Sequence, residues 1–380
     1  MKNIAIVYDR ELDVGGVESH LLSLFRHIDQ QSYKYCVIAP ASARFQAKGN
    51  ALGVNFIPLP PFRPVDLGAV HLLRRAFQKQ AVALVHVHSP TAAIPARAAA
   101  RLLGLATVVT VHLPAIHYYG QRPTMRAAFG RSLYINIDRL MNYTMTDRLV
   151  YVSEQVCREC IELKLTPPNR SQVIPNGIAL EKFTGDDSRR AIRQAVGVPD
   201  TARVITFVGR LDYQKGLDIL LEALATLKEQ FGSYMYVWLV GGGPLADNLM
   251  RQASSTGLSE VVRFAGYQEG VSNYLLASDL FVLPSRFEAM PIVILEALAA
   301  GLPCVVTDVG DNARLVENEL QGLVVKPNDV PALANALRRL FENDELRIEM
   351  GIRARQKALR FDERQMTKQV ELLYDELLAG

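Results

Sequence analysis

The sequence predicts an α/β protein made of two Rossmann-like domains, each built on a parallel sheet, that face each other across a cleft. Three observations support this prediction. Short β-branched runs alternate with helical patterns along the whole chain, which is typical of parallel sheets covered by helices. The runs fall into two sets of about six. A polar stretch that contains glycine, residues 174–190, separates the two sets.

The first set of strand candidates defines a domain at residues 1–170. Its members are residues 4–9, 33–40, 54–60, 83–89, 107–114 and 148–154. The chain ends in a predicted helix, residues 362–380, which we expect to return and pack on this first domain.

The second set of strand candidates defines a domain at residues 171–361. Its members are residues 202–211, 234–243, 261–266, 280–285, 304–310 and 322–327. Ligands of open parallel sheets bind beyond the carboxyl ends of the strands. Two such edges that face each other are therefore expected to create one large site.

Charge is unevenly distributed along the 380 residues, although the net charge is only +3. Residues 1–185 hold 21 Lys and Arg against 12 Asp and Glu, whereas residues 186–380 hold 21 against 27. A basic half is typical of proteins that bind nucleic acid, a membrane surface or phosphorylated ligands. Nucleic acid is disfavoured because the sequence has no recognised binding motif and its second half is acidic.

The four cysteines are too few and too scattered for a disulfide framework, which indicates a reducing compartment. Cys157 and Cys160 form a CxxC, but no second CxxC or close histidine pair completes a zinc site. We interpret them as partly buried thiols on one helical turn. No apolar run reaches transmembrane length, and the N-terminal one is too short for a signal peptide. We therefore expect a cytoplasmic protein.

Two glycine-rich stretches follow predicted strands. Residues 13–18 (DVGGVE) open a helix, so their amides are expected to face an anion. They lack the Lys-Ser/Thr pair of an ATP-binding P-loop. Residues 240–246 (VGGGPLA) match a dinucleotide fingerprint only loosely, so a NAD-dependent dehydrogenase is a distant alternative.

Two glutamates, Glu288 and Glu296, lie eight positions apart in an otherwise apolar stretch. Pro291 suits the first turn of a helix, so we expect the helix to begin near Met290. Both carboxylates can then address a ligand at the N-terminal end, where the amides of residues 292–294 are free to bind an anion. A ligand with phosphate and vicinal hydroxyls would use all these groups. Acidic residues are, however, also common near helix N-termini because of the helix dipole alone.

Two cations, Arg210 and Lys215, lie in the turn between a predicted strand and the next helix. At the carboxyl edge of a sheet they can hold a diphosphate, the arginine through its fork of donors and the lysine as a point charge. The alternative is that both are solvated loop charges.

The chain resembles the family 4 glycosyltransferases, which are retaining enzymes of the GT-B fold. The motifs are GRLDYQKG with Arg210 and Lys215, IPNGI at 174–178, and EAMPIVILE with Glu288 and Glu296, followed by AGLPCVVTDVG. In the first half, GGVE and TVHLP also look like family positions. The resemblance covers nearly the whole chain and is most specific from about residue 174 to 310.

The resemblance implies transfer of a sugar from a nucleotide-diphosphate sugar, UDP- or GDP-linked, to a hydroxyl acceptor. It points to the synthesis of cell-envelope glycan, polysaccharide or glycolipid, with acceptor specificity in the first domain. Arg210 and Lys215 would hold the donor diphosphate. Glu288 would accept hydroxyls near C3 and C4 of the sugar, Glu296 would accept the ribose hydroxyls, and His112 would touch the sugar near its reacting end.

Backbone groups complete the site that the resemblance implies. The amides of Ile292 and Val293 would face the phosphates, and that of Met290 the sugar. Gly15 and Gly16 would close over the phosphates from the first domain.

The reaction chemistry fits these residues. Sugar transfer needs stabilisation of the departing phosphate, and two cations and a helix N-terminus supply it. We therefore expect no metal and no other cofactor, and the chain has no Asp-x-Asp motif. The family implies same-face attack, with the leaving phosphate accepting the proton, so Glu288 is not assigned as a nucleophile. Many relatives have glycine where this chain has Ala289, which bears on donor identity more than on the reaction.

Histidines and arginines of the first half remain to be placed. His86 and His88 share one side of a predicted strand, and we favour structural or acceptor-side roles over metal ligation because no third ligand is evident. Residues 117–143 interleave arginines with aromatic residues. This pattern suits an interfacial helix on anionic lipid, with a lipid-linked acceptor, or an ordinary surface helix.

Two rival functions remain open. A sugar-nucleotide epimerase on the same fold would consume the donor without an acceptor. A non-catalytic nucleotide-sugar-binding subunit would bind the nucleotide without turnover, although the intact set Arg210, Lys215, Glu288 and Glu296 argues against it.

Overall fold

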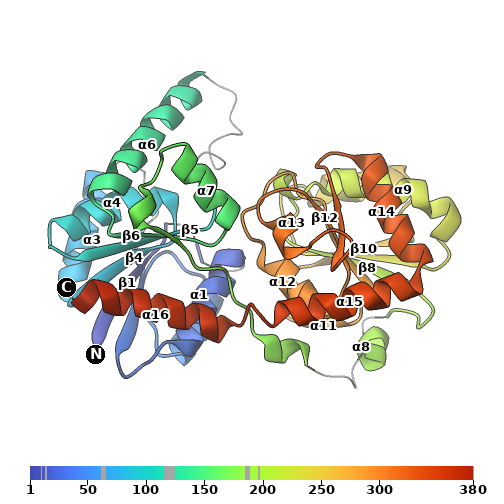
Figure 1. Cartoon of the computed structure of the whole chain (residues 1–380), viewed down its shortest axis with the longest axis horizontal. Helices are drawn as coiled ribbons and strands as arrows, with labels where there is room; N and C mark the ends of the chain where they lie inside the picture. The colour runs from blue at the N-terminus through green and yellow to red at the C-terminus, as the bar shows by residue number, and fades with distance from the viewer. Residues whose placement is uncertain are drawn as a thin grey trace. The chain divides into compact units, whose positions relative to one another are not determined.

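The computed structural model divides the chain into two compact units (Figure 1). Unit 1 comprises Met1–Gly177 and Glu363–Gly380, and unit 2 comprises Ile178–Asp362. The residues that the structure describes are 1–9, 11–12, 15–60, 66–114, 125–184, 189–195 and 197–379, without the side chains of 125–129 and 131.

Unit 1 contains a parallel sheet of seven strands in the order β3-β2-β1-β4-β5-β6-β7 among its described residues. The strands are β1 Lys2–Val7, β2 Tyr33–Ile38, β3 Asn55–Ile57, β4 Val82–Val87, β5 Ala106–Val111, β6 Arg148–Tyr151 and β7 Ser171–Val173. The six predicted strands are present. The sequence pattern did not indicate β7, which pairs with β6 through Leu149 and Ser171. This pairing is why unit 1 extends to Gly177 and not to residue 170.

Helices cover the sheet of unit 1. They are α1 Gly16–His27, α2 Ala43–Ala51, α3 Leu67–Lys79, α4 Pro90–Arg101, α6 Met125–Thr144, α7 Glu154–Glu162 and α16 Glu363–Ala379, with the 3-10 turn η1 Pro168–Arg170. As predicted, the C-terminal helix α16 returns to the first unit. It is anchored by Glu363, which accepts hydrogen bonds from Ser23 and Arg26 of α1.

Unit 2 contains a parallel sheet of six strands in the order β10-β9-β8-β11-β12-β13 among its described residues. The strands are β8 Arg203–Val208, β9 Met235–Val240, β10 Val262–Gly266, β11 Leu280–Leu283, β12 Cys304–Thr307 and β13 Gly322–Val325. All six were predicted. They are continuous apolar runs because helices cover both faces of a parallel sheet.

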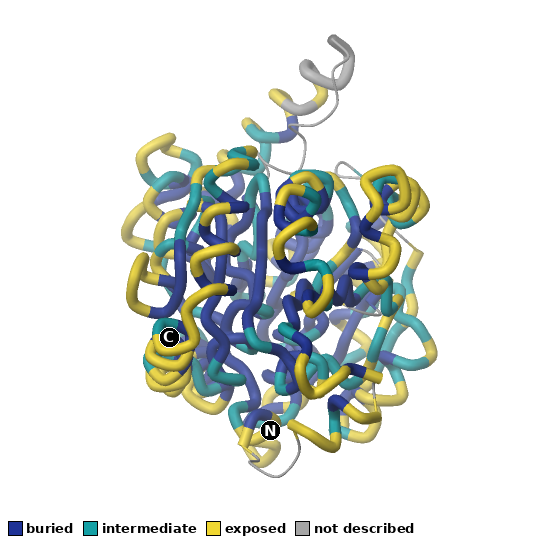
Figure 2. The backbone as a smooth tube through the Cα atoms, turned by 90° about the vertical axis from the view of Figure 1, so that its right-hand side faces the viewer, coloured by how far each residue is buried: buried dark blue, intermediate teal, exposed yellow. Residues whose placement is uncertain are grey.

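The helices of unit 2 alternate with these strands. They are α8 Arg189–Ala195, α9 Leu217–Phe231, α10 Ala246–Ser255, α11 Val271–Leu276, α12 Ile292–Ala299, α13 Asn312–Leu315, α14 Val330–Glu342 and α15 Asp344–Ala358, with the 3-10 turns η2 Leu180–Phe183 and η3 Tyr213–Lys215. In the tube view the interior of the fold is mostly buried, and the outer helices alternate between buried and exposed turns (Figure 2).

Both sheets change winding direction at one place. In unit 1 the connections from β1 run one way to β2 and β3 and the other way to β4, and in unit 2 the same reversal occurs between β8 and β11. Ligands of such sheets bind beyond the carboxyl ends of the strands at this point.

Two further predictions are tested by the fold. All four cysteines are free and buried, so no disulfide framework exists. None of the helices in the described part of the chain combines the length and the apolar character needed to cross a membrane.

Candidate functional site

The predicted cations and carboxylates of unit 2 come together where the sheet changes direction. Arg210 and Lys215 follow β8, and Glu288 follows β11, the strand that pairs directly with β8. Residues separated by more than 70 positions thus share one edge of the sheet. The structure brings Lys215 and Glu288 into contact. Arg210, five residues before Lys215, lies at the surface.

Glu288 is held in one position by three side chains. Its Oε1 atom accepts hydrogen bonds from Lys215 Nζ at 2.5 Å and from Ser285 Oγ at 2.7 Å. Its Oε2 atom accepts one from Gln214 Nε2 at 3.2 Å. Only 6 % of the Glu288 side chain is exposed. The carboxylate is therefore oriented and charge-compensated before any ligand arrives. Sequence reasoning did not identify Ser285 and Gln214, although both flank predicted site residues.

Arg286 joins the two loops that carry the site. Its guanidinium donates to both carboxylate oxygens of Asp218, at 2.9 and 2.7 Å. It also lies over the ring of Tyr213, with 4.3 Å between the guanidinium carbon and the ring centroid. Bidentate and stacked arginines restrict geometry more than a lysine does. Arg286 thus ties the loop after β11 to the loop after β8.

Glycines allow the same loops to approach closely. Gly216 has a φ of +64°, and a Cβ atom there would lie 2.2 Å from the carbonyl oxygen of Pro284. Gly241 has a φ of +132°, and a Cβ atom there would lie 2.0 Å from the carbonyl oxygen of Gly209. The VGGGPLA stretch therefore packs against the loop that carries Arg210. Close packing explains Gly241 and Gly243 without a dinucleotide, whereas Gly242 has open space around its Cβ position.

Helix α12 begins later than the sequence pattern predicted. Its first residue is Ile292, and Pro291 is the extended N-cap residue and not part of the first turn. The amide of Ile294 donates to the carbonyl oxygen of Pro291 at 3.1 Å, so the prediction that it is free was wrong. Within the described part of the chain the amides of Ile292 and Val293 have no acceptor. These two donors remain at the positive end of the helix dipole.

Glu296 lies in the second turn of α12 and is half-buried. Its side chain makes no hydrogen bond within the described residues. Burial raises the pKa of Glu296 to about 7, and the positive charge of Lys182 opposes this rise. Loss of hydration with no compensating donor disfavours the charged form. Such a carboxylate can accept hydrogen bonds from a ligand's hydroxyl groups.

Arg210 differs from Lys215 and Glu288 because its side chain is exposed to solvent. Its side chain is 69 % exposed, and its nearest acidic neighbour, Asp212, is 3.7 Å away. An exposed pair at this distance contributes little to stability. The guanidinium is therefore available for an anionic ligand.

The predicted residues of unit 1 lie at the carboxyl ends of β1 and β5. Gly15 is the N-cap residue of α1, and Gly16 is its first residue. His112 follows β5 directly. A Cβ atom at Gly15 would lie 2.7 Å from Oε2 of Glu18, the flexible end of that side chain, so Glu18 would have to move to accept it.

His86 and His88 occupy different environments. His86 forms two hydrogen bonds. Its Nδ1 atom lies 2.6 Å from the Tyr374 hydroxyl of α16, and its Nε2 atom lies 2.7 Å from the Thr110 hydroxyl. It is fully buried, and burial lowers its pKa to about 3. His86 therefore links the C-terminal helix to the sheet, which is the structural role that we favoured.

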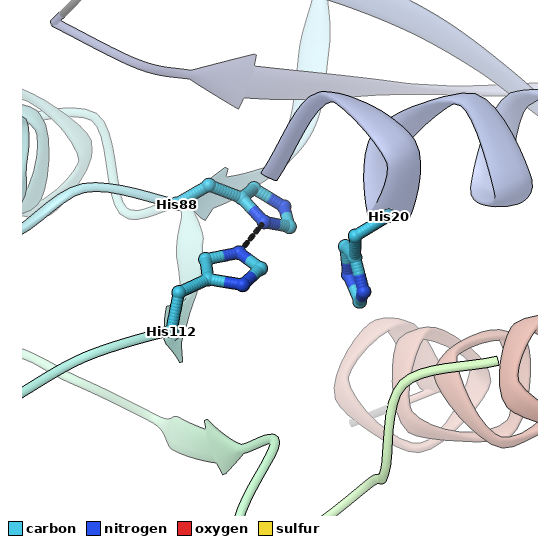
Figure 3. A group of neighbouring side chains, drawn as sticks. All are labelled: His20, His88 and His112. Atoms are coloured by element: carbon cyan, nitrogen blue, oxygen red, sulfur yellow. Dashed lines mark hydrogen bonds between the residues drawn. The ribbon is translucent and has the colours of Figure 1, made fainter. Parts of the chain in front are cut away.

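His88 has two further histidines as neighbours, which sequence reasoning missed. Its Nδ1 atom lies 3.1 Å from His112 Nε2, and His20 of α1 faces this pair (Figure 3). The three rings offer ring nitrogens that all lie within 4.8 Å of one another. The expectation that no third ligand accompanies His88 is therefore wrong. The Nδ1 atom of His20 also lies 3.0 Å from Asn176 Oδ1.

The segment at 117–143 is described only in part, because residues 117–124 lie outside the described residues. Helix α6 packs on α4 through Tyr134, whose hydroxyl donates to the carbonyl oxygen of Pro90 at 2.5 Å. Its outer side exposes Leu133, Leu140 and Tyr143, with exposed fractions of 52 %, 62 % and 41 %. The outer side of α6 therefore carries an exposed apolar strip, Leu133, Leu140 and Tyr143.

Comparison with known proteins matches both units of the chain. The model of "Glycosyl transferases group 1" matches residues 188–357, and that of "Glycosyltransferase Family 4" matches residues 14–182. The Escherichia coli UDP-Gal:alpha-D-GlcNAc-diphosphoundecaprenol alpha-1,3-galactosyltransferase is 32 % identical, over 74 % of this chain and 72 % of that protein. A D-inositol 3-phosphate glycosyltransferase of Saccharomonospora viridis is 30 % identical, over 97 % and 90 %.

Solved structures show the same fold. The Anabaena protein HepE in complex with UDP-glucose superposes with a TM-score of 0.84 at 20 % identity, covering 99 % of this chain and 100 % of that one. The lipopolysaccharide-biosynthesis glycosyltransferase WaaG superposes with a TM-score of 0.80 at 20 % identity, covering 99 % and 100 %.

Proposed function

Because the chain belongs to the family 4 glycosyltransferases of the GT-B fold, we propose that it is a retaining, metal-independent enzyme that uses a nucleotide-diphosphate sugar. The sugar would pass to a hydroxyl acceptor in the synthesis of cell-envelope glycan, polysaccharide or glycolipid. One observation carries this proposal. Lys215 forms an ion pair of 2.5 Å with the buried carboxylate of Glu288 at the place where the sheet of unit 2 changes direction.

The residues around this pair supply what a nucleotide-diphosphate sugar requires. Arg210 and Lys215 neutralise the diphosphate, and the amides of Ile292 and Val293 bind its oxygens. Glu288, fixed by its hydrogen bonds, accepts from the sugar hydroxyls. These groups are in place before the glycosidic bond breaks, so charge that develops on the leaving phosphate is met without reorganisation.

Five further residues complete the proposed donor contacts. Glu296 accepts from the two ribose hydroxyls, which supply the donors that this half-buried carboxylate lacks. The amide of Met290 faces the sugar, and His112 of unit 1 contacts the sugar near its reacting carbon. Gly15 and Gly16 at the start of α1 bind the phosphates through their amides.

The proposed reaction balances without a protein nucleophile. The bond between the anomeric carbon and the diphosphate oxygen breaks, and the acceptor oxygen bonds to the same face of that carbon. The proton of the acceptor hydroxyl passes to the departing phosphate. Glu288 orients the sugar and stabilises positive charge on its ring, and the two cations make a metal unnecessary at the diphosphate.

A lipid-linked acceptor is supported by the Escherichia coli relative, whose name gives a diphosphoundecaprenol substrate and a UDP-linked donor. The outer strip of α6 supports docking on lipid, because Leu133, Leu140 and Tyr143 are exposed beside Arg139. We place the reaction at the cytoplasmic face of a membrane. Leu140→Asp should weaken co-sedimentation with anionic phosphatidylglycerol vesicles, whereas Leu72→Asp on α3 should not. Equal binding by both variants would refute the docking.

The test of the donor site is thermal unfolding with UDP, GDP and ADP and their sugar conjugates, with and without EDTA. A ligand at one hundred times its dissociation constant adds about 2.7 kcal/mol to the free energy of unfolding. We expect stabilisation by a UDP or GDP ligand that EDTA leaves unchanged. Arg210→Ala should abolish it, and Arg338→Ala, an exposed arginine of α14, should retain it. A wild-type protein that no nucleotide stabilises would overturn the donor site.

Product analysis separates transfer from the two rivals. A transferase converts the donor to nucleotide diphosphate and a glycosylated acceptor, with retained configuration at the anomeric carbon. An epimerase would consume the donor without any acceptor, and a binding subunit would give no turnover. Nuclear magnetic resonance of the anomeric proton reports all three outcomes in one assay.

A further inference from the structure

Unit 1 contains a cluster of three histidines, His20, His88 and His112. The proposed transfer reaction uses only His112. We propose that the cluster is a binding site for a divalent transition-metal ion, best suited to Zn²⁺, and that a bound ion inhibits transfer. The three residues come from α1, from the residue after β4 and from the residue after β5. Among the described residues, no other group of three His, Cys, Asp or Glu side chains has ligand spacing.

The spacing of the ring nitrogens suits a tetrahedral ion. Zinc lies about 2.0–2.1 Å from a histidine nitrogen, so two ligands of a tetrahedral ion are about 3.3 Å apart. His88 Nδ1 and His112 Nε2 are already 3.1 Å apart. The ligand atom of His20 lies within 4.8 Å of the others, so a shift of at most about 1.5 Å completes the three ligands. Figure 3 shows His20 facing the bonded pair.

The protonation of His20 suits a metal ligand. If its Nδ1–H donates to Asn176 Oδ1, the lone pair is on Nε2, and this buried atom has no partner within the described residues. Histidines that bind metals nearly always donate their second nitrogen to such an oxygen, which fixes the tautomer.

The ligand set selects the class of ion. Neutral imidazoles bind zinc, copper, nickel and iron, whereas magnesium and calcium require oxygen ligands. Three histidines leave one position of a tetrahedral ion for water. His112 is half-buried, while His20 and His88 are only 1 % exposed. The open position therefore lies on the side of His112.

Inhibition is expected because His112 belongs both to the metal site and to the proposed donor-sugar contact, so this part of the proposal rests on the proposed function. A nitrogen of His112 that binds a metal is no longer available to the donor sugar. His20 and His88 have no contact assigned in the transfer reaction. Removal of His20 should therefore remove inhibition by metal without removing the contact of His112.

The test is a titration of the metal-free full-length chain with Co²⁺, followed by Zn²⁺. We expect one Co²⁺ per chain with the intense visible absorption of a tetrahedral centre, and displacement by Zn²⁺, which binds such sites more tightly. His20→Ala and His88→Ala should lose this absorption. Asn176→Ala should weaken affinity by about 10–100-fold, as loss of a partner of a ligand does. His71→Ala, an exposed histidine of α3, is the matched control and should bind like the wild type.

Two results would overturn the metal site. One is the absence of tetrahedral Co²⁺ absorption in the wild type, and the other is equal binding by a folded His20→Ala protein, checked by circular dichroism. Activity provides the second readout. Zn²⁺ should inhibit wild-type transfer reversibly with EDTA and should not inhibit His20→Ala. Tight Zn²⁺ binding without inhibition would keep the site and refute the proposed role of His112, so failures of the two proposals are distinguishable.

Discussion

The raised pKa of Glu296 predicts that unit 2 becomes less stable as the pH rises through neutrality. Below pH 4.5 the carboxyl group is protonated in both the folded and the unfolded chain, so it contributes no difference. Between pH 4.5 and about 7 the folded state binds more protons than the unfolded state. The free energy of unfolding therefore falls with rising pH across this window.

The magnitude follows from the two pKa values. A change from 4.5 to about 7 corresponds to at most about 3 kcal/mol, since each tenfold change in proton affinity is worth about 1.4 kcal/mol. Glu296→Gln removes the charge at every pH. The stability of the variant relative to the wild type should therefore increase as the pH rises from 5 to 8.5, by up to about 3 kcal/mol.

The assay is urea unfolding followed by the fluorescence of Trp238, the one tryptophan of the chain, which is buried in β9 of unit 2. The exposed Glu260 supplies the control. The free energy of unfolding of Glu260→Gln should differ from that of the wild type by the same amount at pH 5 and at pH 8.5. A constant difference between Glu296→Gln and wild type from pH 5 to pH 8.5 would refute the reasoning. The variant should also bind the nucleotide less tightly, because it loses the charged acceptor for the ribose.

The remaining predictions concern the contacts that shape the same edge of the sheet. The fluorescence assay measures the stability change in all three, and a transfer assay measures activity and the donor KM. Lys215→Met leaves a buried carboxylate without its cation and should lower the free energy of unfolding by about 3 kcal/mol. Adding Glu288→Gln should restore stability but not transfer. A double variant that stays destabilised would contradict the ion-pair argument. Arg286→Ala should cost about 1 kcal/mol and raise the donor KM, because the two loops separate; an unchanged KM would show that the loops hold without it. Gly241→Ala should destabilise by more than about 1 kcal/mol and Gly242→Ala by less, since only the first Cβ meets backbone atoms; equal losses would count against close packing.

Much of the fold was predictable because its signals are local in the sequence. Each strand of unit 2 is an apolar run that alternates with a helical pattern, and the motifs around Arg210 and Glu288 lie directly after such runs. Strand β7 escaped prediction because it has only three residues and is stabilised by pairing with β6. The start of α12 was misplaced by two residues because Pro291 is compatible with both the N-cap and the first turn.

The contacts that give the site its shape are decided by tertiary structure. Arg286 binds Asp218 across 68 positions, and His20 meets Asn176 across 156. The sequence determined the elements, the family and the residue types that carry charge, because periodicity and motif spacing are properties of short segments. Tertiary structure alone decides which histidines contact one another, which amides stay free and which glutamate is buried away from water. The strand order brings distant loops to one edge of a sheet, and no short segment of sequence specifies the resulting distances in space.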